Sequence, residues 1–554
     1  MRNRPLKAIT DSLSAARTVF RNRDLARVEL SWAGSMSGEF LSIVALGVYA
    51  YQAGGAAAVG LVGAIQLAPA ATLSPVAAVL GDRVRRELVV MGSEIVRAAA
   101  MALAAAAVWA DAPAGAVYAL AALAVVASQA LYPAQMALVP LLARSADEVT
   151  AASAASSLIR SAAGLLAPAL GGLVLITGSI GALFVVCAAC FAAAVVLAAT
   201  VRGTAEVRAA PPSRGPLREL LAGFRAVRGD RDIAVVLGIF GVHGIGRGAL
   251  GVLLVIVPLE LLDLHESSVG FFTAAVGVGG LAGAVATAAV AGRRRLAGML
   301  AAGLVLTGGP LMLAGAAEVT AWLLVCVTVV GVGIAVVSAA GTVLLVRSVR
   351  DDVLARVLGV LGTVRAGAMT AGSLATPLLV HLVGVRATLV AIGALTPLTA
   401  LAARRALRRI DDQSIVPEYE LRLLRRSPVF APVLPVALER LAAKLEPITV
   451  PVDTTVVREG DEGDRVYLVA DGRLEVSSNG RALDVLETGE LFGEMALLRG
   501  QPRSATVTAL EDVTLYGLGE EEFLAAVTGH PSSSREIEDV ITARLTARSS
   551  NNLG

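Results

Sequence analysis

Long apolar runs dominate the chain up to Ala403, and shorter runs that alternate between polar and apolar residues follow. Twelve of the long runs reach the roughly 20 residues that a helix needs to cross the hydrocarbon core of a bilayer. The pattern therefore predicts an all-α polytopic membrane domain with twelve transmembrane helices in two six-helix halves. The runs cover residues 28–52, 58–80, 88–110, 114–140, 150–175, 179–201, 233–262, 267–291, 296–316, 320–346, 355–383 and 386–403.

Polar segments divide the chain between and around these runs. The segment between the sixth and seventh runs contains Pro211, Pro212, Pro216 and many arginines, which is typical of a loop. The domains that we expect are an N-terminal arm (1–27), the first half (28–201), a central loop (202–232), the second half (233–403), a charged, helix-like linker (404–427), a small domain (428–547) and a tail (548–554).

Loops that carry arginine alternate with loops that nearly lack it. Arginines crowd the N-terminal arm, the central loop and the linker, and they recur at residues 83–86 and 293–295, whereas Arg386 is the one arginine in the other set of loops. Because loops rich in lysine and arginine stay on the cytoplasmic side, we expect both termini and the small domain in the cytoplasm. The helices would lie in the cell membrane (inner or plasma membrane), which makes the lipid bilayer a partner.

Composition agrees with a membrane protein and argues against several classes. Hydrophobic residues make up 56% of the chain and charged residues 17%, against about 25% charged in soluble proteins. No basic stripe with interleaved aromatic residues suggests nucleic acid as a partner. Four histidines without metal-ligand spacing and no nucleophile motif lead us to expect no catalytic residue, metal or cofactor. The cysteines, Cys187, Cys190 and Cys326, lie in apolar runs and predict neither ligands nor disulfides.

The last part of the chain has the pattern of a small α+β domain. Short alternating runs predict strands, turns rich in glycine and aspartate separate them, and a polar-apolar run at 534–547 predicts a helix that closes over a bound base. We therefore expect a β-barrel jelly roll with flanking helices. The strands that we expect are 454–457, 465–469, 474–477 and 507–515.

Residues 491–507, LFGEMALLRGQPRSATV, have the chemistry to hold a cyclic phosphate on a ribose. Gly493 allows a tight turn into a short helix, 494–498, whose first N–H groups lack internal partners and point at an anion. Glu494 can accept a hydrogen bond from a ribose hydroxyl, and Arg503 can place a fork of donors on a phosphate. The expected nucleotide-binding residues are Gly493, Glu494, Met495, Ala496, Arg503, Ser504 and Ala505.

The segment from about 420 to 547 resembles a cyclic nucleotide-binding domain, on the strength of REGDEGDRVYLVADGRLEV and FGEMALLRGQPRSATV. The resemblance implies that Glu494 holds the ribose 2′-hydroxyl and that Arg503 holds the phosphate. Ser504 follows the arginine where many cGMP binders have Thr, so the expected regulatory ligand is cAMP, with cGMP less favoured. The alternative is a domain of this fold that has lost its ligand and serves for docking.

The loop after the second apolar run reads GDRVRR at residues 81–86. It resembles, in shortened form, the signature loop G-x-x-x-D-R-x-G-R-R of the major facilitator superfamily. The resemblance covers about residues 20–408 and implies a gating loop in which Asp82 latches the cytoplasmic side. The alternative is a basic cytoplasmic loop of the kind that any transporter has. The gating-loop residues are Gly81, Asp82, Arg83 and Arg86.

The fifth apolar run carries GLLAPALGG at residues 164–172. It resembles the antiporter motif G-x-x-x-G-P-x-x-G-G of the superfamily, with Ala167 at a glycine position, and implies an exporter. LYPAQMALVPLL at 131–142 is similar to the fourth helix of enterobactin-exporter-like members. The alternative is close packing of small residues between helices. The motif residues are Gly164, Pro168, Gly171 and Gly172.

Several polar residues lie at membrane depth, where each charge is costly and calls for a reason. The family resemblance places the first, fifth, seventh and eleventh helices around a central cavity. It makes Glu39 a candidate proton carrier and Arg160, Arg247 and Arg365 candidate ligands of an anionic substrate. The alternative is that Glu39 pairs with one of these arginines and fixes the contact between halves. The cavity residues that we expect are Glu39, Gln66, Gln129, Arg160, His243, Arg247 and Arg365.

Together these features predict a secondary active transporter, an exporter or antiporter, that cytoplasmic cAMP modulates through the C-terminal domain. Its partners would be a cyclic nucleotide and a small-molecule substrate that is anionic or amphipathic. The alternative is a receptor or scaffold with a transporter-like body that does not transport. A nucleotide-gated channel is disfavoured because no selectivity loop is present in the sequence, and we do not expect an enzyme.

Overall fold

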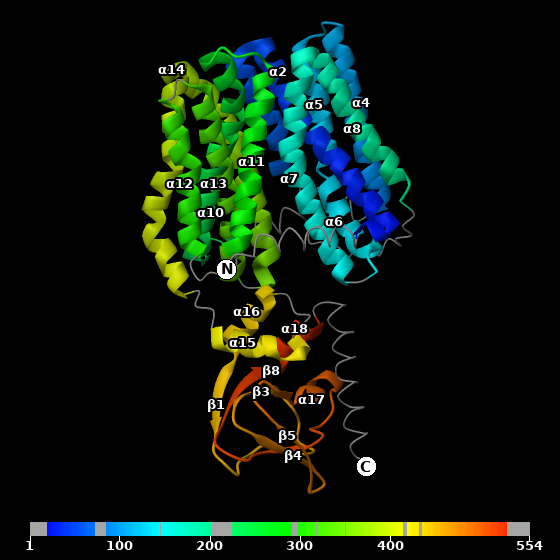
Figure 1. The fold of residues 1–554 in the computed structure, drawn as a ribbon, viewed down its shortest axis with the longest axis vertical. Helices are drawn as coiled ribbons and strands as arrows, with labels where there is room; N and C mark the ends of the chain where they lie inside the picture. Colours follow the sequence, from blue (N-terminus) through cyan, green and yellow to red (C-terminus); the bar gives the residue numbers. More distant parts are fainter. Residues whose placement is uncertain are drawn as a thin grey trace. The chain divides into compact units, whose positions relative to one another are not determined.

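The computed structural model divides into two compact units, Met1–Gln413 and Ser414–Gly554, which we describe separately (Figure 1). The boundary falls inside the predicted linker. Of the linker, residues up to Gln413 belong to a long helix, and Glu418–Arg426 forms a helix of the second unit. The structure describes residues 19–72, 85–144, 146–201, 224–225, 227, 229–290, 296–316, 319–349, 351–413, 418–430 and 435–528.

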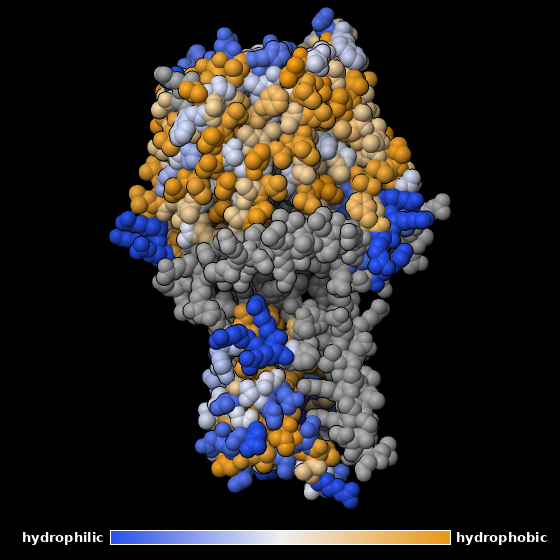
Figure 2. Space-filling view, in the orientation of Figure 1, coloured by the Kyte–Doolittle hydropathy of each residue, from blue (hydrophilic) through white to orange (hydrophobic). Residues whose placement is uncertain are grey.

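The described part of the first unit is built of long helices. Apolar side chains cover much of its outer face (Figure 2), as lipid contact requires. The first half contains α2 (Arg23–Thr72), α4 (Arg86–Trp109), α5 (Ala114–Ser128), α6 (Leu131–Leu142), α7 (Ala146–Thr177) and α8 (Ile180–Ala199). The second half contains α10 (Arg231–Ile256) with a π-helical turn η1 (Val257–Leu261), α11 (Ser267–Val290), α12 (Leu296–Ala314), α13 (Thr320–Ser348) and α14 (Asp351–Gln413).

Ten helices of the described residues are long and apolar enough to cross a membrane. Two of them, with 48 and 58 residues, far exceed the roughly 20 residues of one crossing. Each breaks at glycine: α2 at Gly54 and Gly55, where φ of Gly55 is +60°, and α14 at Gly384, where φ is +81°. These breaks fall between the predicted first and second and between the predicted eleventh and twelfth segments. A helical membrane body is thus confirmed, and the count of twelve stays a prediction.

The predicted segment 114–140 is not one continuous helix, because α5 ends at Ser128 and α6 begins at Leu131. The carbonyl oxygen of Val125 accepts from Ser128 Oγ at 2.7 Å and from Gln129 Nε2 at 3.0 Å. The Gln129 N–H bonds to Val126 instead, at 3.2 Å. The side chains of Ser128 and Gln129 thus take the place of the main-chain N–H of Gln129 at the Val125 carbonyl oxygen, and α5 ends there. Hydrophobic periodicity does not reveal such local hydrogen bonds.

Small residues bring the two halves together. A Cβ on Gly277 of α11 would lie 2.5 Å from the carbonyl oxygen of Gly164, and one on Gly270 would lie 2.5 Å from that of Pro168 in α7. A Cβ on Gly172 would lie 2.7 Å from the carbonyl oxygen of Ser267. The antiporter-like motif is therefore part of the packed contact between α7 and α11, while Gly171 faces α2. This matches the alternative of close small-residue packing.

The second unit is two antiparallel four-stranded sheets with helices at their ends. Their strand orders are β1-β8-β3-β6 and β2-β7-β4-β5. The helical elements are α15 (Glu418–Arg426), η2 (Pro428–Phe430), α16 (Pro435–Lys444), α17 (Glu494–Arg499) and α18 (Glu520–Thr528). The strands are β1 (Glu446–Val450), β2 (Thr455–Val457), β3 (Arg465–Asp471), β4 (Leu474–Ser478), β5 (Arg481–Leu486), β6 (Leu491–Phe492), β7 (Thr506–Ala509) and β8 (Val513–Gly519).

This barrel confirms the predicted fold, with differences in the strands. Val469, Leu474 and Leu515 are fully buried between the sheets, and the rings of Phe430 and Phe523 pack edge to face at 6.2 Å among the helices. The predicted strand 507–515 is wrong as one element. A turn separates β7 from β8, and there the carboxylate of Asp512 accepts from the N–H of Val452 at 3.0 Å. The sequence analysis missed β1, β5 and the short β6, and the predicted helix 534–547 lies outside the described residues.

Candidate functional site

The cassette 491–507 forms a cradle at one edge of the barrel. β6 leads into Gly493, whose φ of +86° turns the chain into α17, and Gly500, with φ +59°, ends that helix. A Cβ on Gly493 would lie 2.5 Å from Arg503 Nη1, so a larger residue there would displace the guanidinium. Glycine is thus required at this position both by the backbone and by the close approach of Arg503.

Arg503 is buried, with 5% of its surface exposed, and its position is fixed from several sides. Its Nη1 donates to the carbonyl oxygen of Gly493 at 2.8 Å, and its Nη2 to that of Arg465 at 2.7 Å. Within the described residues it forms no ion pair. A buried charge needs an anion or strong polar partners. The cradle thus offers an oriented cation to an anionic ligand.

The turn between β2 and β3 closes over this arginine. The main-chain N–H of Arg503 donates to the main-chain carbonyl oxygen of Asp461 at 2.8 Å. The main-chain carbonyl oxygen of Arg503 accepts from the N–H of Gly460, also at 2.8 Å. A Cβ on Gly463 would lie 2.8 Å from Arg503 Cζ and 2.9 Å from Ala496 Cβ. The glycines of this turn therefore let two segments that are far apart in sequence meet at the guanidinium.

The other predicted nucleotide residues lie around Arg503, with one exception. Glu494, 6% exposed, is the first residue of α17, Ala496 is buried beside the arginine, and Ser504 and Ala505 follow it before β7. The side chain of Met495 instead packs into the hydrophobic cluster of the helices. Only its main-chain N–H remains for the role predicted from the sequence.

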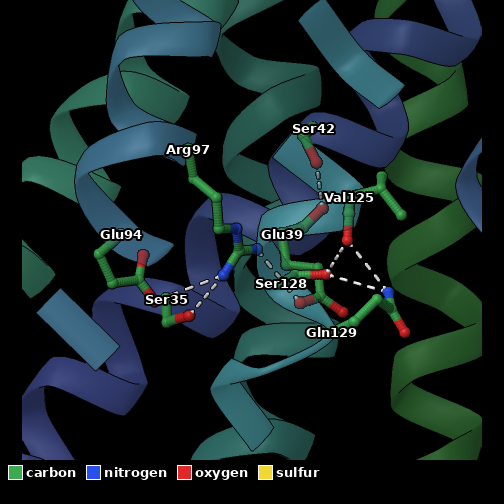
Figure 3. Close-up of polar contacts among 8 residues, drawn as sticks. All are labelled: Ser35, Glu39, Ser42, Glu94, Arg97, Val125, Ser128 and Gln129. Carbon is green, nitrogen blue, oxygen red and sulfur yellow. Dashed lines mark hydrogen bonds and ion pairs between the residues drawn. The ribbon is translucent and has the colours of Figure 1, made fainter. Parts of the chain in front are cut away.

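A second candidate site is a cavity of about 250 Å³ inside the first half of the membrane unit. Three of the predicted residues, Glu39, Gln66 and Gln129, line it together with Ser42 and Ser128. Glu39, Ser42 and Gln66 belong to α2, Ser128 ends α5, and Gln129 follows it; Figure 3 shows all of these except Gln66. Polar residues that are distant in sequence thus converge where a membrane interior would otherwise be apolar.

Arg97 of α4 is the centre of this cavity's polar network, and the sequence analysis missed it. Its Nη2 lies 3.2 Å from Glu39 Oε2, and its Nη1 donates to Ser35 Oγ at 2.8 Å and lies 3.4 Å from Glu94 Oε1 (Figure 3). The alternative, in which Glu39 pairs with Arg160, Arg247 or Arg365, is therefore wrong. α4 belongs to the same half, so the pair does not fix the contact between halves.

The remaining predicted charges of the second half form a separate group. His243 and Arg247 lie one turn apart on α10, and Arg365 of α14 is close enough to act electrostatically on both. His243 is 4% exposed, and neither ring nitrogen has a hydrogen-bond partner in the described structure. Arg247 lines a small cavity with Thr307 and Thr396. Neither arginine forms an ion pair within the described ranges.

Arg160 and Arg86 lie apart from both groups. The Arg160 guanidinium is 5.1 Å from the ring centre of Trp32 and 5.5 Å from that of Tyr132, a cation–π arrangement. Arg86 begins α4 and its Nη1 donates to the carbonyl oxygen of Ala137 at 3.2 Å. The other gating-loop residues, Gly81, Asp82 and Arg83, lie outside the described residues.

Long apolar helices in two packed halves, followed by an antiparallel barrel with a buried arginine, define a multi-pass membrane protein with a ligand-binding domain. The chain belongs to the Major Facilitator Superfamily, whose family model matches residues 30–372 and, in a second match, 236–439. The family model of the cyclic nucleotide-binding domain matches residues 447–530. The predicted fusion is confirmed, and the enterobactin-exporter-like branch stays a prediction.

Three curated relatives each match about a fifth to a quarter of the chain. The Pycsar effector protein XpPycTIR of Xanthomonas perforans is 36% identical over 20% of this chain and 37% of its own. A cyclic nucleotide-gated potassium channel of Rhizobium etli is 35% identical over 22% and 32%. A CRP-like cAMP-activated global transcriptional regulator of Mycobacterium tuberculosis is 28% identical over 24% and 60%. The chain thus spans less than two thirds of each relative.

Among solved structures, the regulatory domain of Toxoplasma gondii PKA with cAMP is 34% identical to this chain. The match covers 21% of this chain and 44% of that one, with a TM-score of 0.19.

Proposed function

We propose that this protein is a secondary active transporter, an exporter or antiporter, whose activity cytoplasmic cAMP modulates through the C-terminal domain. The observation that carries the regulatory part is Arg503, a buried guanidinium without an anionic partner among the described residues, in a domain attached to a superfamily transporter body. The names of the curated relatives, which include cyclic nucleotide gating and cAMP activation, support a regulatory ligand rather than a cofactor. Ser504 after the arginine favours cAMP over cGMP.

The contacts between halves support alternating access. Gln52 donates to Glu266, and Ser373 Oγ donates to the carbonyl oxygen of Gly60 at 3.2 Å. These contacts and the α7–α11 glycine contacts lie near the ends of the helices that connect to the arginine-poor loops. We therefore interpret this conformation of the transporter as closed on the side of those loops. With the arginine-rich loops and the nucleotide domain in the cytoplasm, this is the inward-facing state of a transporter in the cell membrane.

The second half supports an anionic substrate. Arg247 and Arg365 carry two positive charges at membrane depth, without an ion pair among the described residues, beside a buried His243. Unpaired charges in an apolar interior are costly, so a bound anion would lower the free energy of this site. The cluster therefore favours a substrate with a carboxylate, phosphate or phenolate group.

The test is uptake of a panel of radiolabelled organic anions into proteoliposomes that contain the full chain. We expect saturable uptake of at least one anion, lost in Arg247→Gln and kept in Arg405→Gln, an exposed arginine of α14. If no member of the panel is taken up, the non-transporting receptor or scaffold becomes the better account. Uptake that Arg247→Gln leaves unchanged would contradict the anion site.

A further inference from the structure

Two carboxylates share one arginine inside the first half. Arg97 reaches Glu94, three residues earlier on α4, through Nη1 at 3.4 Å, and Glu39 of α2 through Nη2 at 3.2 Å (Figure 3). The side chains of Glu94 and Arg97 are 0% and 4% exposed, whereas that of Glu39 is 40% exposed. The partly exposed carboxylate of Glu39 and the fully buried carboxylate of Glu94 therefore compete for the guanidinium of Arg97.

The charge of this cluster does not balance when all three groups are ionised. Two carboxylates and one guanidinium sum to minus one, and the charges that act on Glu94 are those of Arg97 and Glu39. The facing helix α8 contributes the Phe191 ring, 4.1 Å from the Arg97 guanidinium, and the end of α5 with the residue after it contributes Ser128 and Gln129 to the cavity. None of these groups titrates. Because a net charge in an apolar interior is costly, one added proton makes the cluster neutral.

One carboxylate oxygen of the cluster, Glu94 Oε2, is a suitable position for that proton. Glu94 Oε2 is fully buried and has no hydrogen-bond partner in the described part of the protein. An ionised oxygen in that position loses its hydration without compensation. Glu39 faces the cavity of about 250 Å³ instead and can exchange protons with water there. Glu39 can thus accept a proton from water in the cavity, and Glu94 can hold a proton in a position without water contact.

We infer that Glu39, Glu94 and Arg97 form a proton-binding site in which the two carboxylates share one proton. A proton from a hydronium ion in the cavity binds Glu39, water leaves, and Arg97 pairs with the ionised Glu94. Transfer of that proton to Glu94 restores the pair of Arg97 with Glu39. Like-charged carboxylates in one site behave as a coupled pair that titrates together. The site differs from the predicted single carrier Glu39, and its role as the coupling site rests on the proposed transport function.

Infrared titration of the full chain in lipid vesicles tests the site without a transported substrate. A protonated carboxyl group gives a C=O stretching band that moves in D2O. We expect such a band in the wild type, lost in Glu39→Gln and equally lost in Glu94→Gln, because either change leaves one carboxylate paired with Arg97. Arg97→Gln leaves two carboxylates without a cation, and both bind protons, so the band grows roughly twofold.

The control is Glu148→Gln, a carboxylate of α7 that accepts from the N–H of Arg144 at 2.8 Å and from Asn22 Nδ2 at 2.9 Å, outside this cluster. This change leaves the shared band in place. Gel filtration of each variant confirms folding, and glutamine keeps the size of glutamate. A band that one glutamate substitution removes and the other leaves means a single acid and overturns the shared site, as does a band that neither removes. Either result leaves the transport function standing, since the band needs no flux.

Discussion

At the scale of single residues, two buried arginines differ in what compensates their charge. Arg97 has two carboxylates within 3.4 Å, whereas the hydrogen bonds of Arg503 end on two carbonyl oxygens. Carbonyl oxygens orient a guanidinium but carry no net charge, so an anion still gains from binding it. The charge of the first arginine is thus compensated within the protein, whereas the charge of the second has no anionic partner among the described residues, which favours the proposed anionic ligand.

The Arg503→Lys variant should bind cAMP about 10 to 100 times more weakly, because lysine keeps the charge but loses the fork of donors, worth about 1.5–3 kcal/mol. Isothermal titration of the detergent-solubilised full chain measures the affinity. Arg473→Lys is the matched control, since that arginine is exposed in the same domain and pairs with Glu511. Equal affinities for Arg503→Lys and the wild type would contradict the assignment of Arg503.

A tyrosine in the same domain gives a pH dependence. Burial, with the neighbouring Glu420 carboxylate that accepts its hydrogen bond at 3.0 Å, raises the pKa of Tyr516 from 10 to about 12. An acid whose pKa is higher in the folded state stabilises the fold below the unfolded pKa, and this contribution falls as pH rises from 10 to 12. Thermal unfolding at pH 9 and pH 11 should show a smaller loss in Tyr516→Phe than in the wild type. An identical loss would contradict this account.

At the scale of elements, the sequence predicted one side of the Arg503 cradle and only part of the membrane cavity. Gly493, Glu494 and Arg503 lie in one short stretch, so they could be predicted together. The approach of the β2–β3 turn to the guanidinium is a contact over about 40 residues of chain, which the local pattern does not encode. The cavity depends on which faces of α2, α4 and α5 meet, which no local pattern encodes. Glu39, Gln66 and Gln129 were found because polar residues in apolar runs are conspicuous. Arg97 lies in such a run too, but its partner becomes visible only when α4 packs beside α2.

The two glycines that bound α17 should respond differently to substitution. Both have positive φ, so alanine at either costs roughly 1–2 kcal/mol of strain. A Cβ on Gly493 also meets Arg503 Nη1, whereas one on Gly500 meets nothing within 4 Å. We therefore expect Gly493→Ala to weaken cAMP binding at least tenfold and Gly500→Ala to leave it near the wild-type value. Calorimetry on both variants checks this, and equal losses would contradict the proposed cradle geometry.

At the scale of the whole molecule, one chain contains two compact units. The superfamily body has closely packed halves, with glycines of α7 against glycines of α11. The barrel has its own core and its own buried arginine. Sequence patterns were enough to predict both units, because bilayer length and strand alternation are strong signals. They also placed the glycine breaks of α2 and α14 between predicted segments, but they missed the break between α5 and α6, which depends on side-chain hydrogen bonds.

Substitution at the contact between halves should affect the membrane unit alone. Gly270→Ala adds a Cβ within 2.5 Å of the Pro168 carbonyl oxygen, and overpacking of this kind costs about 1–3 kcal/mol. Gly280→Ala, on the same helix with nothing within 4 Å, is the matched control. Thermal unfolding in detergent should show a lower midpoint for the first variant only. A drop of the same size in both would mean that helix flexibility, not the contact between halves, limits stability.

The most direct test of regulated transport is anion flux in proteoliposomes, with and without cAMP on the side of the nucleotide domain. We expect cAMP to change the flux of the wild type, in either direction, and to leave the flux of Arg503→Ala unchanged while Arg473→Ala responds like the wild type. A wild-type flux that does not respond to cAMP, or a response that survives in Arg503→Ala, would contradict the account.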